Sequence, residues 1–456
     1  MTATPTLTRP ARPDVPPGRP RSGRRGRFEA WVERWSEVLF ALVVLTWLWT
    51  LSVHARVPMS TALITIASLT LVRGLGTPGG RAEVDRLPVH PDYYAPAALT
   101  LAYLAALAWT EARGYAWERL EFAAQALLIP VAFFVWRRHF VRWGRAYLAV
   151  LIGFAAAAAV GVSAYALSNY GALVVALGQG RAVPVPLIQH VPFAVLEAFG
   201  ALIGLHLATD RRGGWAWWGA VCALACVVAL HLLAVRTGLV LFYIGAAGYG
   251  LRWALGPVRP AVALVAVPTV LLATGALALQ VPSVERRVAY ARYDLARATG
   301  ARAGMNSDGG RVLSFRAAAG VIADDPVLGA GAEGIAVAME REYDRLGHAG
   351  LRHGSTNQWL FSWSHAGLLG FLGVCCVLLT PLLEGGWWRR PLVAEWIAMM
   401  AAWWMVESPL ETDVGPSLAL GILYLLKSGT SSSTTATLIP GDVAPTGSRR
   451  RAASAG

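Results

Sequence analysis

Long apolar stretches alternate with short polar segments along most of the chain. About twelve stretches reach about 17 to 25 residues, the length that a helix needs to cross a hydrocarbon core of about 30 Å. They begin near Ser36, Pro58, Ala95, Leu120, Ala146, Leu187, Trp215, Thr237, Ala261, Asn357, Pro391 and Val414. One polar segment, from about Gln280 to Thr356, is much longer than the others. The pattern predicts an all-α polytopic membrane protein of about twelve transmembrane helices, with a partly helical loop between the ninth and the tenth.

Arginines mark alternate connections between these stretches. They occupy the amino-terminal tail, the carboxy-terminal tail and the connections around residues 73–86, 137–145, 211–212, 252–259 and 389–390. Cytoplasmic loops retain Lys and Arg, whereas translocated loops are depleted of them. We therefore expect both termini to be cytoplasmic and the long polar segment to face the periplasm or the cell exterior.

The predicted organisation has five parts. A basic, disordered cytoplasmic tail (1–34) precedes transmembrane helices one to nine (35–280), a periplasmic loop (281–356), helices ten to twelve (357–427) and a disordered cytoplasmic tail (428–456). The first tail combines many arginines with Pro and Gly, so it cannot bury enough apolar surface to fold alone. We expect no cleavable signal peptide, because the first apolar run lacks a small-residue cleavage site.

Composition agrees with a membrane protein, since 55% of the residues are hydrophobic, 15% are charged and the mean hydropathy is +0.48. A net charge of +13 makes nucleic-acid binding an alternative. Arginines that orient a protein in a membrane explain this charge without any binding to nucleic acid. The basic tail would be attracted to anionic lipid headgroups. We predict membrane lipids as partners and no nucleic acid.

The sequence offers weak candidates for a metal site. Cys222 and Cys226 share a helix face, but no His or carboxylate joins them at ligand spacing, which favours packing. Asp324 and Asp325 precede Pro326, and helix termination explains both carboxylates. The chain also lacks an Asp-x-Asp pair. We expect no metal cofactor.

Polar residues near the predicted outer ends of the spans are functional candidates, because such groups are costly to hold beside lipid. Arg236 occupies a tight turn between two spans and has no carboxylate nearby in sequence, which favours an anionic ligand; snorkelling to water is the alternative. His190 lies near the outer mouth, where a structural hydrogen bond is equally consistent. Glu407 and Glu411 fill the last outward turn and could position an arginine or an acceptor hydroxyl, or simply face solvent.

Two arginines of the long loop are further candidates for the site. We expect a helix over residues 312–323 with Asp308 as its N-cap, and Arg311 and Arg316 five residues apart, not quite on one face. One side chain would then reach inward while the other pairs outside. Guanidinium groups bind phosphate oxygens bidentately and keep their charge, so two or three of them could replace a metal ion at a diphosphate.

His353 is the strongest candidate for a general base. An imidazole with an ordinary pKa of about 6.5 accepts a proton near neutral pH, and nearby arginines disfavour its cationic form. His348 lies in a stretch flanked by glycine, and His365 lies on the following helix, where packing is the favoured role.

The end of the loop and the next helix resemble the O-antigen ligase and O-antigen polymerase membrane proteins. In that family an arginine-bearing external loop leads to His-Asn-x-aromatic-Leu, followed by Gly-Leu-x-Gly on the next helix. The residues in matching register are Asn357, Trp359, Leu360, Gly367, Leu368 and Gly370. Pro326 to Gly331 resembles the family's Pro-x-x-Gly-x-Gly, and the resemblance covers about Pro184 to Leu426.

The chain departs from the family at one position, because the histidine before Asn357 is Thr356 here. The nearest imidazole, His353, is displaced by three residues. Either His353 reaches the same place through a turn at Gly354, or this chain is impaired or uses another group.

The resemblance implies a metal-independent glycosyltransferase at the periplasmic face of the bacterial inner membrane. It would move an undecaprenyl-diphosphate-linked glycan onto lipid A-core or another glycan acceptor. The implied catalytic residues are His353, Arg311 and Arg236, and the implied substrate-binding residues are Arg316, Asn357, His190 and Glu407.

Two alternatives remain open. A polymerase would use the same donor chemistry on a growing lipid-linked chain. A transporter or flippase of lipid-linked oligosaccharide would instead need a polar path through the helices, for which His206, Glu197 and His231 are the candidates.

Overall fold

The computed structural model describes residues 24–53, 56–110, 113–181, 189–209, 215–255, 268–269, 273–296, 307–331, 334–351, 354–383, 390–412 and 414–429. Across these ranges the regular elements are helices and no strand is found, which confirms the all-α prediction. Residues 430–456 of the predicted tail 428–456, residues 1–23 of the amino-terminal tail and residues 256–267 and 270–272, around the start of the span predicted near Ala261, lie outside the described residues.

Before the long polar segment, the described chain contains α1 (Arg24–Val53), α2 (Arg56–Gly76), α3 (Pro78–Val84), α4 (Pro91–Tyr94), α5 (Ala97–Ala106), α6 (Arg113–Val135), α7 (Arg137–Ser168), α8 (Tyr170–Gly178), α9 (His190–Thr209), α10 (Ala216–Leu233) and α11 (Arg236–Leu255), and residues 273–278 are also helical. The polar segment and the chain after it form α13 (Pro282–Ala296), α14 (Ser307–Asp324), α15 (Gly334–Arg345), α16 (Gln358–Leu379), α17 (Pro391–Val406), the 3-10 turn η6 (Pro409–Glu411) and α18 (Gly415–Gly429).

Apolar helices identify a membrane protein, with fewer clear spans than predicted. Five are long and apolar enough to cross a membrane: Glu33–Leu51 within α1, α7, α9, α10 and Gln358–Leu383. The pair Thr61–Gly76 and Pro78–Val89, bent by 99°, adds a sixth if it is one broken span. The described residues thus support five or six spans, and the predicted count of twelve is not confirmed.

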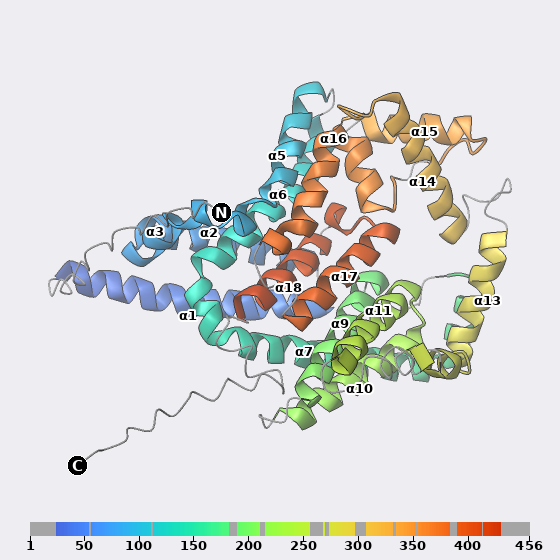
Figure 1. The fold of residues 1–456 in the computed structure, drawn as a ribbon, viewed down its shortest axis with the longest axis horizontal. Coiled ribbons are helices and arrows are strands. Elements are labelled where there is room, and N and C mark those ends of the chain that lie inside the picture. Colours follow the sequence, from blue (N-terminus) through green and yellow to red (C-terminus); the bar gives the residue numbers. More distant parts are fainter. Residues whose placement is uncertain are drawn as a thin grey trace, which may run out of the picture.

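Three of the predicted spans correspond to shorter apolar helices, Ala97–Trp109, Pro391–Val406 and Gly415–Lys427. Of these, α17 and α18 occupy the middle of the molecule (Figure 1). Trp396 and Trp404 of α17 are fully buried and Trp403 is 1% exposed. A helix that is apolar all round fits the core of a large protein as well as it fits lipid, so composition alone does not distinguish the two.

The helix pair α9 and α10 packs through small residues. A Cβ atom added to Gly204 of α9 would lie 2.7 Å from the carbonyl oxygen of Gly219 of α10, so the two backbones touch. Close approach of this kind is typical of helices that associate within a membrane. It holds α9 buried and fixes the position of its first residue, His190.

The first helix differs from the predicted tail boundary. α1 begins at Arg24, so the last part of the predicted tail 1–34 is helical. Its polar end is anchored by Arg73 of α2, which lies 3.9 Å from Glu33 and 3.6 Å from Glu37 and stacks on Trp136. These contacts, at the end of the chain distant from the long loop, extend the helix beyond its apolar stretch.

The long polar segment folds against the apolar bundle. α14 and α15 pack on each other and on α16 through a small separate core that includes Leu313, Ala317, Met339, Tyr343 and Phe361. α13 packs on α8, at the side of the bundle next to α10 (Figure 1). The loop therefore brings α13 and α14 to the end of the bundle where α9 and α11 begin.

Candidate functional site

A kink in α16 anchors the loop. The helix leaves helical geometry at Gly367, whose φ is +61°, and this frees backbone groups on both sides of the bend. The loop completes them, since the amide of Ala330 donates to the carbonyl of Ser364 (2.8 Å) and the amide of Leu368 donates to the carbonyl of Val327 (3.1 Å). Buried backbone groups are almost always paired, so the bend in the helix and the seating of the loop depend on each other.

Glycine is required at this contact. A Cβ atom on Gly367 would lie 2.0 Å from the carbonyl oxygen of Val327, and one on Gly329 would lie 2.5 Å from the amide nitrogen of Gly367. Gly329 and Gly331 also have positive φ, of +68° and +72°. Because glycine has no Cβ atom, the backbone at these two residues can approach α16 closely.

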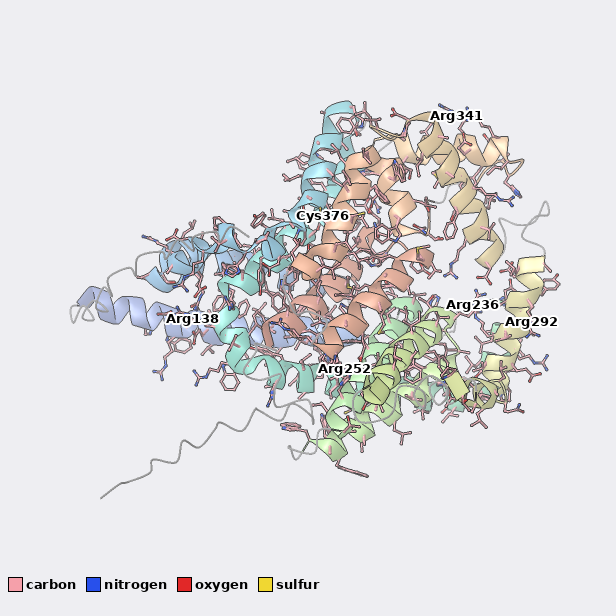
Figure 2. All side chains as sticks on the ribbon, viewed as in Figure 1. Arg138, Arg236, Arg252, Arg292, Arg341 and Cys376 are labelled. Atoms are coloured by element: carbon pink, nitrogen blue, oxygen red, sulfur yellow. The ribbon has the colours of Figure 1, made fainter. Side chains whose placement is uncertain are left out.

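Arg236 stands where α10 turns into α11. Ala234 adopts the left-handed conformation (φ +48°) that ends α10, and α11 starts two residues later at Arg236. Its guanidinium forms an ion pair with the carboxylate of Asp308 in α14. Figure 2 shows Arg236 at the edge of the apolar bundle that faces α13 and α14. The turn thus aims a cation at the loop.

The start of α14 corrects the predicted N-cap. The helix begins at Ser307, so Asp308 lies in its first turn and not at the cap. The amide of Asp308 donates to Asp294 Oδ2 of α13 (2.7 Å), which satisfies that end of the helix from another element. The carboxylate of Asp308 is then available to Arg236 and to Arg311, whose Nη1 lies 3.4 Å from Oδ1.

Arg311 connects α14 to the turn after α17. Its guanidinium forms an ion pair with Glu407 as well as with Asp308, and the side chains of Arg311 and Glu407 are 22% and 24% exposed. Burial raises the pKa of Glu407, and the charge and hydrogen bond of Arg311 oppose that rise. Glu407 therefore positions an arginine, as one of the two sequence interpretations expected.

Sequence analysis missed a third arginine, Arg287 of α13. It is 9% exposed, and its Nη1 donates to the carbonyl of Arg181 (3.3 Å). Burial, together with repulsion from Arg236 and Arg311, lowers the pKa of Arg287, while Asp308 opposes this shift. Arg236 and Arg311 thus pair with the carboxylate of Asp308, and Arg311 also pairs with Glu407. Arg287 lies within electrostatic range of Arg236, Arg311 and Asp308.

Two other predicted residues lie at the edge of this arginine cluster, which we define as Arg236, Arg287 and Arg311. His190, the first residue of α9, is half-buried and within electrostatic range of Arg287 and Arg311. Arg316 is exposed, about 140° around α14 from Arg311. The expectation that one of the two loop arginines reaches inward agrees with this arrangement.

Asn357 and Thr356 form the junction between the loop and α16. Asn357 caps the helix, since its Oδ1 accepts from the amide of Leu360 (3.0 Å), while its Nδ2 donates to the carbonyl of Met405 in α17 (3.0 Å). The hydroxyl of Thr356 lies 3.4 Å from that of Ser314 in α14. Asn357 therefore holds the junction, and His353 lies outside the described residues.

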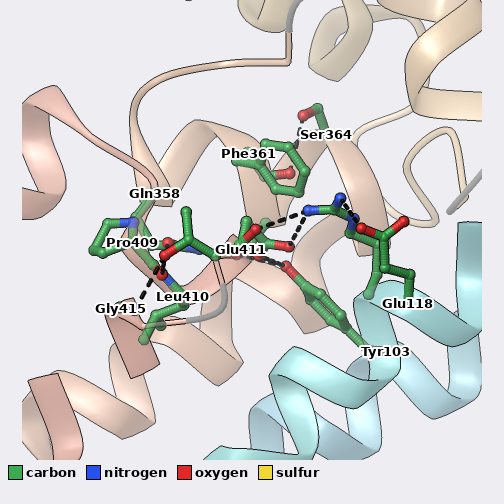
Figure 3. Close-up of polar contacts among 12 residues, drawn as sticks. Tyr103, Glu118, Gln358, Phe361, Ser364, Pro409, Leu410, Glu411 and Gly415 are labelled. Carbon is green, nitrogen blue, oxygen red and sulfur yellow. Dashed lines mark hydrogen bonds and ion pairs between the residues drawn. The ribbon is translucent and has the colours of Figure 1, made fainter. Parts of the chain in front are cut away.

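A buried polar network, also missed by sequence analysis, surrounds Glu411 (Figure 3). The carboxylate accepts hydrogen bonds from the hydroxyl of Tyr103 and from Gln358 Nε2 (3.2 Å), and Arg119 Nη1 donates to the Glu411 carbonyl (2.9 Å). Glu411 is 7% exposed, so a solvated turn does not describe it. The network ties the turn that bears Glu407 to α5, α6 and α16.

The three residues that a transport path would need have separate surroundings. His206 pairs with Glu395 of α17 (2.9 Å), whereas Glu197 is fully buried beside Cys226. His231 bonds within α10 and to the first part of α11. Within the described residues, neither carboxyl oxygen of Glu197 has a hydrogen-bond partner, and no hydrogen bond or ion pair joins any two of the three residues.

The arginine cluster can bind an anion. In the part of the chain that the structure describes, no three His, Cys, Asp or Glu side chains are grouped as a metal site. The cations of the cluster are guanidinium groups. They carry permanent charge, have two carboxylates as present partners, and lie at the end of apolar helices. A diphosphate would replace those carboxylates with a ligand of higher charge that matches guanidinium geometry.

The sequence matches no protein-family model and no curated protein.

Proposed function

We propose that this chain is a membrane glycosyltransferase of the O-antigen ligase type. It would transfer a glycan from an undecaprenyl diphosphate donor to a hydroxyl group of lipid A-core or another surface acceptor, at the periplasmic face of the inner membrane. The observation that carries the proposal is the convergence of Arg236, Arg287 and Arg311 from three helices at the end of the apolar bundle.

The arginines suit the charge that such a transfer develops. As the bond between the anomeric carbon and the phosphate oxygen breaks, negative charge grows on the diphosphate. Fixed cations at that position stabilise the transition state without any movement at the moment of reaction. Since the leaving group is a diphosphate, no general acid is required. The lipid chain of the donor would lie along the apolar helices, of which α9 and α11 begin beside the cluster.

Transport is the weaker interpretation. A transporter should hold connected polar groups within its spans. Here His206, Glu197 and His231 have different neighbours. Arg236, Asp308, Arg311 and Glu407, in contrast, are joined by ion pairs.

The proposal is tested by glycan transfer in a deletion strain complemented with wild type, Arg236→Ala or Arg311→Ala. Surface polysaccharide is resolved by size, lipid-linked polymer is measured, and membrane insertion of each variant is verified. Both variants should lose acceptor-attached glycan and accumulate lipid-linked polymer. Arg292→Ala, which removes an exposed arginine of α13, is the matched control.

Other outcomes identify other functions. Single-repeat caps in place of long chains would indicate a polymerase, because chain growth would then be the missing step. Full transfer by both alanine variants would refute the assigned site. Loss of donor from the outer leaflet, with no polymer accumulating there, would indicate a flippase.

A further inference from the structure

Transfer to a hydroxyl group needs an acceptor for its proton, and this inference therefore rests on the proposed function. The position next to Asn357 is held by Thr356, whose hydroxyl lies 3.4 Å from that of Ser314. An alcohol does not take up a proton at neutral pH, so the described residues of the junction offer no base, and His353 lies outside them. Within the described part of the chain, the candidate proton acceptors lie on other elements at the arginine cluster.

Four described groups at the cluster could accept a proton. Asp308 is paired with both Arg236 and Arg311, and two cations make a carboxylate a poor base. Asp294 is fully buried and accepts a hydrogen bond from the amide of Asp308. The hydroxyl group of an incoming glycan could therefore not reach it without disrupting α14.

His190 and Glu407 remain. His190, at the start of α9, lies within electrostatic range of two cations, Arg287 and Arg311. Glu407, among the described residues, forms an ion pair with Arg311, and its side chain is 24% exposed. It thus combines access with a single cationic partner.

Glu407 also lies beside the junction. Asn357 Nδ2 donates to the carbonyl of Met405 (3.0 Å), two residues before Glu407. Thr356 contacts Ser314, one helical turn from Arg311, which in turn pairs with Glu407. The carboxylate and the hydroxyl of Thr356 therefore belong to one closed ring of contacts between α14, α16 and α17.

We propose that Glu407 is the catalytic base of the transfer. Binding of the donor diphosphate to Arg311 would break the ion pair between Arg311 and Glu407 and so free the carboxylate. Without donor, Arg311 neutralises the carboxylate. When a lipid diphosphate enters the cluster, Arg311 exchanges the carboxylate for the phosphate oxygens, and Glu407 becomes available to the acceptor. Base and donor are thereby coupled through one side chain.

The step balances as a substitution at the anomeric carbon. The acceptor oxygen forms a bond to that carbon while its proton passes to Glu407. The bond from the carbon to the phosphate oxygen breaks, and its electron pair leaves with the lipid diphosphate, which gains one negative charge. The proton on Glu407 then passes to water, which restores the carboxylate.

Burial of Glu407 supports the assignment, since it raises the pKa of this carboxyl above the ordinary value and so strengthens it as a base. The opposing contribution of Arg311 would fall once the guanidinium binds phosphate, which raises the pKa further. Among the described residues, Arg311 of α14 is the charged group that acts on Glu407 directly. Asp308 pairs with Arg311 and Arg236, and Arg287 of α13 and His190 of α9 lie within electrostatic range of Arg311.

The test uses the full chain and separates donor binding from transfer. Binding of undecaprenyl diphosphate in detergent is followed by tryptophan fluorescence, and transfer is measured in membranes between about pH 4.5 and 8. Glu407→Gln keeps the shape and a hydrogen bond to Arg311 but cannot accept the proton. It should lower the transfer rate at least about 100-fold and remove the loss of rate on acidification.

The affinity for undecaprenyl diphosphate distinguishes a base from a residue that only positions Arg311, because loss of a positioning residue would weaken donor binding. Undecaprenyl diphosphate affinity should be unchanged or rise in Glu407→Gln, because the competing carboxylate is gone. Glu285→Gln, an exposed carboxyl of α13, is the control and should match wild type in both measurements.

Two results would overturn the assignment. Transfer by Glu407→Gln within about threefold of wild type would show that another group takes the proton. Equal losses of affinity and transfer would show that Glu407 only positions Arg311. Failure of wild type to bind undecaprenyl diphosphate would instead refute the proposed function.

Discussion

Burial distinguishes Arg287 from its neighbours on α13. Arg287 and Asp294 are seven residues apart, so they share one face of the helix, and both are buried, whereas Arg286 and Arg292 are exposed. That spacing is visible in the sequence and could have identified Arg287. The pairing of Arg236 with Asp308 could not be predicted in this way, because only the folding of the loop joins residues so far apart.

Arg287→Ala should weaken undecaprenyl diphosphate binding about 10- to 100-fold, since a charge-assisted contact contributes about 1.5–3 kcal/mol. Fluorescence titration of the purified protein measures the effect. Arg292→Ala should stay within about twofold of wild type, because an exposed arginine is screened by water. Equal behaviour of the two variants would remove Arg287 from the site.

Helix α16 shows how a single element depends on a distant segment. The match to Gly-Leu-x-Gly identified Gly367 from sequence, but its partner, the backbone at Val327, was not predicted. A sequence pattern indicates which residues share a face of a helix. It does not indicate which distant segment will pair with backbone groups that a kink leaves free, because that pairing depends on the tertiary fold. The helix over 312–323 was predicted, and its true start at Ser307 was missed because Asp294 supplies the missing hydrogen bond from α13.

Gly367→Ala should destabilise the protein by about 2–4 kcal/mol, because alanine is strained at positive φ and its Cβ would collide with the carbonyl of Val327. Thermal unfolding in detergent measures the loss. Gly161→Ala, in open space on α7, should stay within about 1 kcal/mol of wild type or stabilise the helix. A neutral Gly367→Ala would mean that the kink is not needed for stability.

At the scale of the whole molecule, apolar composition predicted the helices, and the described residues support five or six of the expected spans. α17 and α18 are short and lie within the core, so their apolar residues face protein on most sides. Burial in protein and burial in lipid select the same residue types, which is why about twelve runs pass a length criterion. What sequence did locate was the end of the bundle where charged groups gather.

The polar network around Glu411 joins the first half of the chain to the last. Tyr103→Phe removes the hydroxyl that donates to Glu411, leaving a buried carboxylate with one fewer partner, and should cost about 1–3 kcal/mol of unfolding free energy. Tyr94→Phe, at an exposed tyrosine, is the control for thermal unfolding. Equal stability of the two variants would show that the contact contributes little.

The kink in α16 has a consequence for how a substrate reaches the cluster. Lifting the loop would leave the carbonyl of Ser364 and the amide of Leu368 without partners, at about 1–3 kcal/mol each. These hydrogen bonds therefore oppose a hinged opening of the loop away from α16. For the lipid-linked donor of the proposed transfer, they favour entry from the side, between the helices, over entry from above the loop.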